Sequence, residues 1–196
     1  MSVVNLSKPE QFIGGANYHG TISPDIAVSL GRDVLDLSTL QPEAFFNPPI
    51  TSDLASQPLF YQRIKMAWLS LVIPKPNITV LNPELEQTAR LTAHADMVDK
   101  AFNMETNNRY VFIYSPRAVL LPHVDLGLVS VNTELIGSAK LSWLDHETGT
   151  VFDETEMVPG DITEINGNYT YSVANTSLDS RIVLAQLLPT VEFHKK

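Results

Sequence analysis

The sequence contains no cysteine. Disulfide bonds, thiolate metal sites and cysteine nucleophiles are therefore excluded, while this absence alone leaves the cellular compartment open. Basic residues are also scarce, because 13 lysines and arginines stand against 22 aspartates and glutamates, and the formal net charge is −9. A general nucleic-acid binder needs a basic face for the phosphates, and anionic membranes attract basic surfaces. We therefore expect neither nucleic acid nor membrane as a partner.

Long apolar runs are missing as well. No stretch of the sequence reaches the roughly 18 consecutive apolar residues that suggest a membrane-spanning helix. The first residues, MSVVNLSKPEQF, lack the basic and apolar regions of a signal peptide. We therefore expect a cytoplasmic protein, and the class of ligand left open is a small molecule or a peptide.

The first hundred residues carry helix and loop signals. Residues 23–37 begin with serine, proline and an acid ahead of an apolar pattern, which predicts a short helix, and residues 82–102 are the clearest helical candidate. Three prolines predict an irregular loop over residues 41–53. Residues 58–73 are apolar enough for either a buried helix or a strand, and periodicity does not decide between them.

The sequence changes character near residue 108, where short strand-like runs begin to alternate with turn residues. Eight such runs occupy residues 109–115, 118–126, 128–135, 139–145, 150–158, 161–166, 169–175 and 181–188. This spacing predicts a sandwich or barrel such as a jelly roll. We therefore predict one α+β domain. Its jelly-roll-like core spans residues 108–196, and residues 1–107 form a helical and irregular elaboration packed on one face.

The run LLPHVDLGLV, residues 120–129, places His123 and Asp125 two residues apart in an apolar setting. A β-strand would send both side chains to the same face, where they could share a metal ion. Taken by itself, the spacing also fits a solvated loop or a hydrogen-bonded pair. A metal site would need at least one further ligand from elsewhere in the chain.

Residues 108–188 resemble the aspartyl/asparaginyl β-hydroxylase-like branch of the Fe(II)- and 2-oxoglutarate-dependent dioxygenases. That family has a His-x-Asp pair on an early core strand, a later Pro-Gly-Glu/Asp turn, and a distal motif close to His-x-Val-x-Asn-x-Ser-x-x-x-Arg. Here His123 and Asp125 match the pair, residues 159–161 match the turn, and residues 171–181 match the distal motif. The first hundred residues have no counterpart in this resemblance.

The resemblance implies that the core, residues 108–196, is a double-stranded β-helix, a cupin-like barrel. It also implies an oxygenase that hydroxylates an amino acid, a peptide or a small metabolite. Fe(II) would be held by His123 and Asp125, and Arg181 would bind the C5 carboxylate of the cosubstrate 2-oxoglutarate through a bidentate contact. An alternative for Arg181 is a surface position at the start of a strand, paired with Asp179 or with a glutamate.

The sequence departs from the family at the distal histidine, where Tyr171 stands. Tyr171 could ligate iron as a phenolate, or it could fill space beside a weak two-ligand site. In a third interpretation His146 or His94 completes the ligand set. The departure also leaves open a second function, in which the protein is a catalytically inactive relative that serves as a small-molecule-binding or scaffold protein.

Overall fold

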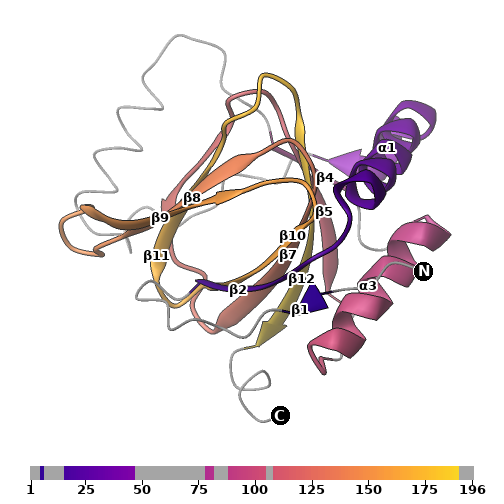
Figure 1. Ribbon diagram of the computed structural model, residues 1–196. Helices are drawn as coiled ribbons and strands as arrows, with labels where there is room; N and C mark the ends of the chain where they lie inside the picture. Colours follow the sequence, from indigo (N-terminus) through magenta and orange to yellow (C-terminus); the bar gives the residue numbers. More distant parts are fainter. Residues whose placement is uncertain (1–4, 7–15, 47–77, 82–87, 105–107, 190–196) are drawn as a thin grey trace, which may run out of the picture.

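A computed structural model describes residues 5–6, 16–46, 78–81, 88–104 and 108–189, and its strands form two antiparallel sheets (Figure 1). The larger sheet contains, from edge to edge, β1 (Asn5–Leu6), β2 (Ala16–Thr21), β10 (Asp161–Asn166), β7 (Leu128–Ile136), β12 (Arg181–Pro189), β5 (Arg109–Tyr114), β4 (Ile78–Leu81) and β3 (Phe45–Phe46). The smaller sheet contains β6 (Val119–His123), β11 (Thr170–Asn175), β8 (Ala139–Leu144) and β9 (Val151–Met157). The two sheets face each other, and the predicted jelly-roll class is confirmed.

All eight runs predicted after residue 108 are strands, from β5 to β12. The N-terminal part of the chain adds strands that the sequence analysis did not predict. β1 and β2 extend one edge of the larger sheet, while β4 and β3 extend the other. These strands are only two to six residues long. They are held mainly by pairing with a neighbouring strand, so they carry little of the alternating pattern that reveals a strand in a sequence.

Helix α1 (Pro24–Leu40) begins where the serine, proline and acid predict a start. Its buried residues Ala27, Leu30, Gly31 and Val34 recur three to four positions apart and form one face. Gly31 allows close packing on the larger sheet, because a Cβ at this position would lie 2.5 Å from Ile136 Cγ1. A short 3₁₀ helix, Pro42–Ala44, follows α1 in the region that was predicted to be irregular.

Helix α3 (Ala89–Ala101) lies within the predicted helical segment 82–102, of which residues 82–87 are outside the described part. The hydroxyl of Thr88 caps its first turn by accepting a hydrogen bond from the Leu91 backbone N–H at 3.3 Å. Residues 58–73, which fitted either a helix or a strand, are also outside the described residues. Within the described chain, neither helix is long and apolar enough to cross a membrane.

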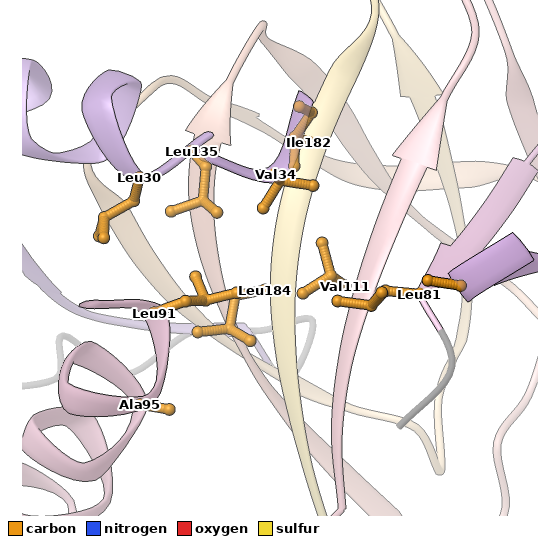
Figure 2. Close-up of a cluster of buried hydrophobic side chains, with 10 residues drawn as sticks. Leu30, Val34, Leu81, Leu91, Ala95, Val111, Leu135, Ile182 and Leu184 are labelled. Carbon is orange, nitrogen blue, oxygen red and sulfur yellow. The ribbon is translucent and has the colours of Figure 1, made fainter. Parts of the chain in front are cut away.

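Both helices cover the outer face of the larger sheet, as predicted (Figure 1). Figure 2 shows the apolar cluster that they share with it, which comprises Leu30, Val34, Ala44, Leu81, Leu91, Ala95, Val111, Leu135, Ile182 and Leu184. Burying a large apolar side chain of this kind stabilises a fold by about 1.5–3 kcal/mol. In β12, Ile182 and Leu184 face the helices, so Arg181, Val183 and the other alternate residues face the barrel interior.

Candidate functional site

A cavity of about 390 Å³ lies inside the barrel, between the two sheets. His123, Asp125, Tyr171 and Arg181 all line it, so the structure brings together the four residues that the sequence singles out. Much of the remaining wall is apolar, with contributions from Phe112, Leu120, Ile165, Val183 and Leu187. A cavity of this size and lining suits a small organic molecule held by a few polar groups.

His123 is the last residue of β6, and its ring is oriented by the backbone. Nδ1 lies 2.7 Å from the carbonyl oxygen of Leu121, which can only accept a hydrogen bond, so Nδ1 carries the proton of the neutral ring. Nε2 lies 3.6 Å from Oδ2 of Asp125 and, in the neutral ring, is the nitrogen that can bind a metal. A histidine that binds a metal usually has its second nitrogen fixed in this way.

Asp125 reaches the cavity from a turn. The expectation that His123 and Asp125 share a face of one strand was wrong, because β6 ends at His123. The Asp125 backbone N–H donates instead to the carbonyl of Gly167 at 2.8 Å. A Cβ on Gly167 would lie 2.6 Å from the Asp125 carbonyl oxygen, so only glycine fits there. Sequence reasoning missed Gly167, although the Asn-Gly-Asn turn that contains it was visible.

The Asp125 carboxylate is stabilised in its ionised form. Burial acts to raise its pKa, but the neighbouring His123 ring and the hydrogen bond from Tyr171 outweigh this effect, and the pKa of Asp125 is lowered. The side chain remains 43% exposed. The ionised carboxylate therefore faces Nε2 of His123 at 3.6 Å, a separation at which the two form an ion pair when the ring is protonated or can hold a metal cation between them.

Tyr171 lies on β11 and is buried between the rings of His123 and Trp143, with ring centroids at 4.4 and 5.6 Å. Its hydroxyl donates a hydrogen bond to Oδ2 of Asp125 at 2.6 Å. Burial, followed by the adjacent Asp125 charge, raises the pKa of the phenol well above its usual value. Tyr171 is therefore a protonated donor to the carboxylate when no cation is bound.

The two other histidines considered as ligands lie elsewhere. His94 is a buried residue of α3 that faces the larger sheet from the helix side, with Nε2 3.3 Å from the Thr133 hydroxyl oxygen. His146 is exposed in the β8–β9 turn, with Nδ1 2.9 Å from the Thr170 hydroxyl oxygen. Neither residue lines the cavity. The interpretation that one of them completes the ligand set is therefore wrong.

Arg181 is 1% exposed, and its guanidinium is bound by an internal carboxylate. Nε donates to Oε2 of Glu134 at 2.9 Å, and Nη2 donates to the other oxygen of Glu134, which is 0% exposed. Burial acts to lower the pKa of Arg181, but Glu134 and Tyr114 more than compensate and raise it. Arg181 is thus paired with a glutamate, as one alternative proposed. The surface position that the same alternative gave to Arg181 was wrong, because the pair is buried.

Glu134 is a site residue that sequence reasoning missed. It lies on β7, 47 residues before Arg181, and no motif marks it. The available signal was an acid inside the apolar run 128–136, where a charge needs a buried partner. Glu134 occupies the Nε/Nη2 edge of Arg181, so a ligand in the cavity would meet the Nη1/Nη2 edge, in which Nη1 is buried and has no hydrogen-bond partner.

The residues present fit a weakly held divalent cation. Among the described residues, no three histidine, aspartate or glutamate side chains are grouped as metal ligands. His123 and Asp125 supply two donors, and the Tyr171 oxygen lies 2.6 Å from one of them. Two protein ligands leave most positions of an octahedral ion for small-molecule donors.

No family model matches the chain, and no curated protein matches it. Three solved structures illustrate what the chain resembles. The CENP-C cumin domain of Drosophila melanogaster is 9% identical over 60% of this chain and 70% of that chain, with a TM-score of 0.39. A predicted oxalate decarboxylase of Thermotoga maritima is 13% identical over 58% and 81%, with a TM-score of 0.38. Peruvianin-I, a cysteine peptidase from Thevetia peruviana latex, is 12% identical over 41% and 49%, with a TM-score of 0.37.

The chain therefore spans about half the length of Peruvianin-I. Likenesses this weak carry no argument about function, and the assignment of the fold rests on the two sheets described above. The oxygenase branch that the motifs resemble, with its iron and 2-oxoglutarate, stays a prediction.

Proposed function

We propose that the barrel cavity is the site of a metal-dependent oxygenase that uses a 2-oxo acid as cosubstrate and hydroxylates a small metabolite, an amino acid or a peptide. One observation carries the proposal. Nε2 of His123 and the ionised Oδ2 of Asp125 lie 3.6 Å apart at a cavity wall, and the Leu121 carbonyl accepts the hydrogen bond of Nδ1. In the neutral ring Nε2 is an electron-pair donor, so the two atoms can bind one cation between them.

The residues around His123 and Asp125 orient the two side chains and shield the site. The Leu121 carbonyl fixes the orientation of the His123 ring, and the Tyr171 hydroxyl holds the Asp125 carboxylate. The apolar wall excludes water from the bound substrate. An Fe(II) ion bound to the pair would supply the activation of dioxygen. The motif resemblance makes 2-oxoglutarate the predicted cosubstrate.

A second candidate function is binding of a small molecule without turnover. It is favoured by the hydrogen bond from Tyr171 to Asp125, because a neutral phenol stands where the resembled family has its third iron ligand. With only two strong donors, the affinity for iron would be low, and the cavity would serve as a binding pocket.

Anaerobic calorimetric titration with Fe(II), with and without 2-oxoglutarate, tests the proposal. We expect saturable Fe(II) binding that His123→Ala abolishes and that His146→Ala, which removes a histidine outside the cavity, leaves unchanged. Admission of air should then convert 2-oxoglutarate to succinate if the protein is an oxygenase. Metal binding without succinate favours the binding protein, and equal Fe(II) affinity in both variants contradicts the metal site.

A further inference from the structure

The pairing of Arg181 with Glu134 changes what the cavity can recognise. The carboxylate of Glu134 takes two N–H groups of the guanidinium, and the Tyr114 ring covers its face, with Cζ 4.7 Å from the ring centroid. The remaining nitrogen, Nη1, is buried without a hydrogen-bond partner, and Arg181 lines the cavity. A ligand would therefore meet one N–H edge of a cation whose charge is already compensated.

The cavity supplies no second cation. Arg181 is the only lysine or arginine among the described residues that line it, and His123 and Asp125 are the proposed metal ligands. Glu134 cancels the charge of Arg181, so an anion placed beside Nη1 would be desolvated without an uncompensated positive partner. A buried carboxylate held under these conditions is costly.

Neutral hydrogen-bond donors are present at the same wall. Asn132, two residues before Glu134 on β7, lines the cavity and accepts a hydrogen bond from Ser130 through Oδ1 at 2.6 Å. Its amide nitrogen remains a donor. Together with Nη1 of Arg181, it suits a carbonyl or hydroxyl oxygen of a ligand, whose burial needs hydrogen bonds but no countercharge.

We propose that Glu134 determines the ligand specificity of the cavity by occupying Arg181, so that the site prefers a 2-oxo acid with one carboxylate and a neutral, oxygen-bearing tail over a dicarboxylate. This inference rests on the proposed metal-dependent site, where the 2-oxo carboxylate of the ligand would bind. It differs from the prediction from the motifs, in which Arg181 binds the second carboxylate of 2-oxoglutarate.

The test compares 2-oxoglutarate with its 5-methyl ester, which replaces the second carboxylate by a neutral ester that keeps a carbonyl oxygen and adds one methyl group. In anaerobic calorimetry with Fe(II), we expect the unmodified protein to bind the ester at least about tenfold more tightly. Glu134→Gln leaves Arg181 with an uncompensated charge and should raise the affinity for 2-oxoglutarate at least about tenfold, with little change for the ester. Glu154→Gln, which alters a carboxylate paired with Lys140 outside the cavity, should leave both affinities unchanged.

The possible outcomes test the role of Glu134 separately from the proposed metal-dependent function. Tighter binding of 2-oxoglutarate than of the ester by the unmodified protein overturns the role of Glu134 and leaves the metal site standing. Failure of both compounds to bind in the presence of Fe(II) overturns the metal-dependent function and the inference with it. The comparison in the unmodified protein decides the matter even if Glu134→Gln does not fold.

Discussion

The barrel interior and the interface beneath the helices lie on opposite sides of the larger sheet (Figure 1). Each contains an arginine paired with acidic side chains, Arg109 with two and Arg181 with one. On the helix side, Nη2 of Arg109 donates to Asp96 at 2.7 Å and to Asp99 at 2.5 Å, and the arginine side chain is 18% exposed. On the barrel side, Arg181 and Glu134 are removed from solvent. The first group joins a helix to the sheet and keeps contact with water, whereas the second joins two strands beside a cavity.

The two regions also differ in the surroundings of their histidines, His94 on the helix side and His123 on the barrel side. His94, on the buried face of α3, has its pKa lowered from 6.5 to about 4 by burial and is a neutral packing residue at physiological pH. His123 lines the cavity, and its Nε2 lies 3.6 Å from Oδ2 of Asp125. Residues of the same type are thus structural on one side of the sheet and open to a ligand on the other. The surroundings of a side chain, more than its identity, separate the two roles.

Of the changes that test this comparison between the two sides of the sheet, we expect loss of the Arg181–Glu134 pair to lower the free energy of unfolding most. We expect Arg181→Met to lower the free energy of unfolding by about 3–5 kcal/mol, because Glu134 would be left buried without a partner. Urea denaturation measures this change. The double substitution Arg181→Met/Glu134→Leu should recover much of the loss, since no charge then remains uncompensated.

Arg109→Met is the matched control on the helix side. Water can reach this group, so we expect a smaller loss of about 1–2 kcal/mol. Equal losses for the two arginine variants would remove the distinction between a buried and a solvated pair.

The next largest expected effect is a loss of stability at acidic pH that arises from His94 on the helix side. The folded pKa of His94 is about 4 and its unfolded value is 6.5, so between these values the unfolded chain binds a proton that the folded protein does not. Stability is therefore lost as the pH falls from 6.5 toward 4, by about 3 kcal/mol for this residue. Denaturation with urea at pH 7 and at pH 4.5 measures the difference.

His94→Gln isolates this contribution, because glutamine does not titrate. The difference in unfolding free energy between the original protein and the variant should shrink as the pH is lowered, whatever the nearby carboxylates do in both proteins. Asp99, whose pKa is raised mainly by burial, acts in the opposite direction and is common to the two. A difference that stays constant with pH would show that His94 does not bind its proton more weakly in the folded state.

The strands of the barrel could be predicted because their signal is local. Apolar, β-branched runs separated by turn residues mark β5 to β12, whereas the two-residue strands β1 and β3 have no such pattern. The start of α1 was predicted for the same reason, from the serine, proline and acid at residues 23–25.

The site was predictable only where a motif stood in the sequence. His123, Asp125, Tyr171 and Arg181 were found in this way, and the cavity lies between them. Glu134 was not found, because its pairing with Arg181 depends on which strands become neighbours, and β7 and β12 are far apart in the chain. The turn that carries Asp125 was missed because the apolar run continues past the end of β6.

The smallest effect concerns Tyr171, the barrel residue whose role the motifs left undecided. We expect Tyr171→Phe to lower the free energy of unfolding by about 1 kcal/mol, because it removes one hydrogen bond to a carboxylate that is partly solvated. We also expect the aerobic iron-loaded protein to be colourless, because burial and the Asp125 charge keep the phenol protonated. Visible absorption spectroscopy checks this expectation.

The converse substitution tests the same position for metal binding. Tyr171→His places a neutral imidazole beside Asp125 and should raise the Fe(II) affinity measured by anaerobic titration, because it adds a third donor to His123 and Asp125. A visible band that Tyr171→Phe abolishes would instead show phenolate-to-iron(III) charge transfer, since a bound cation can lower the pKa of a phenol enough to ionise it. Tyr171 would then be a ligand, and the barrel would hold its metal with three protein groups rather than two.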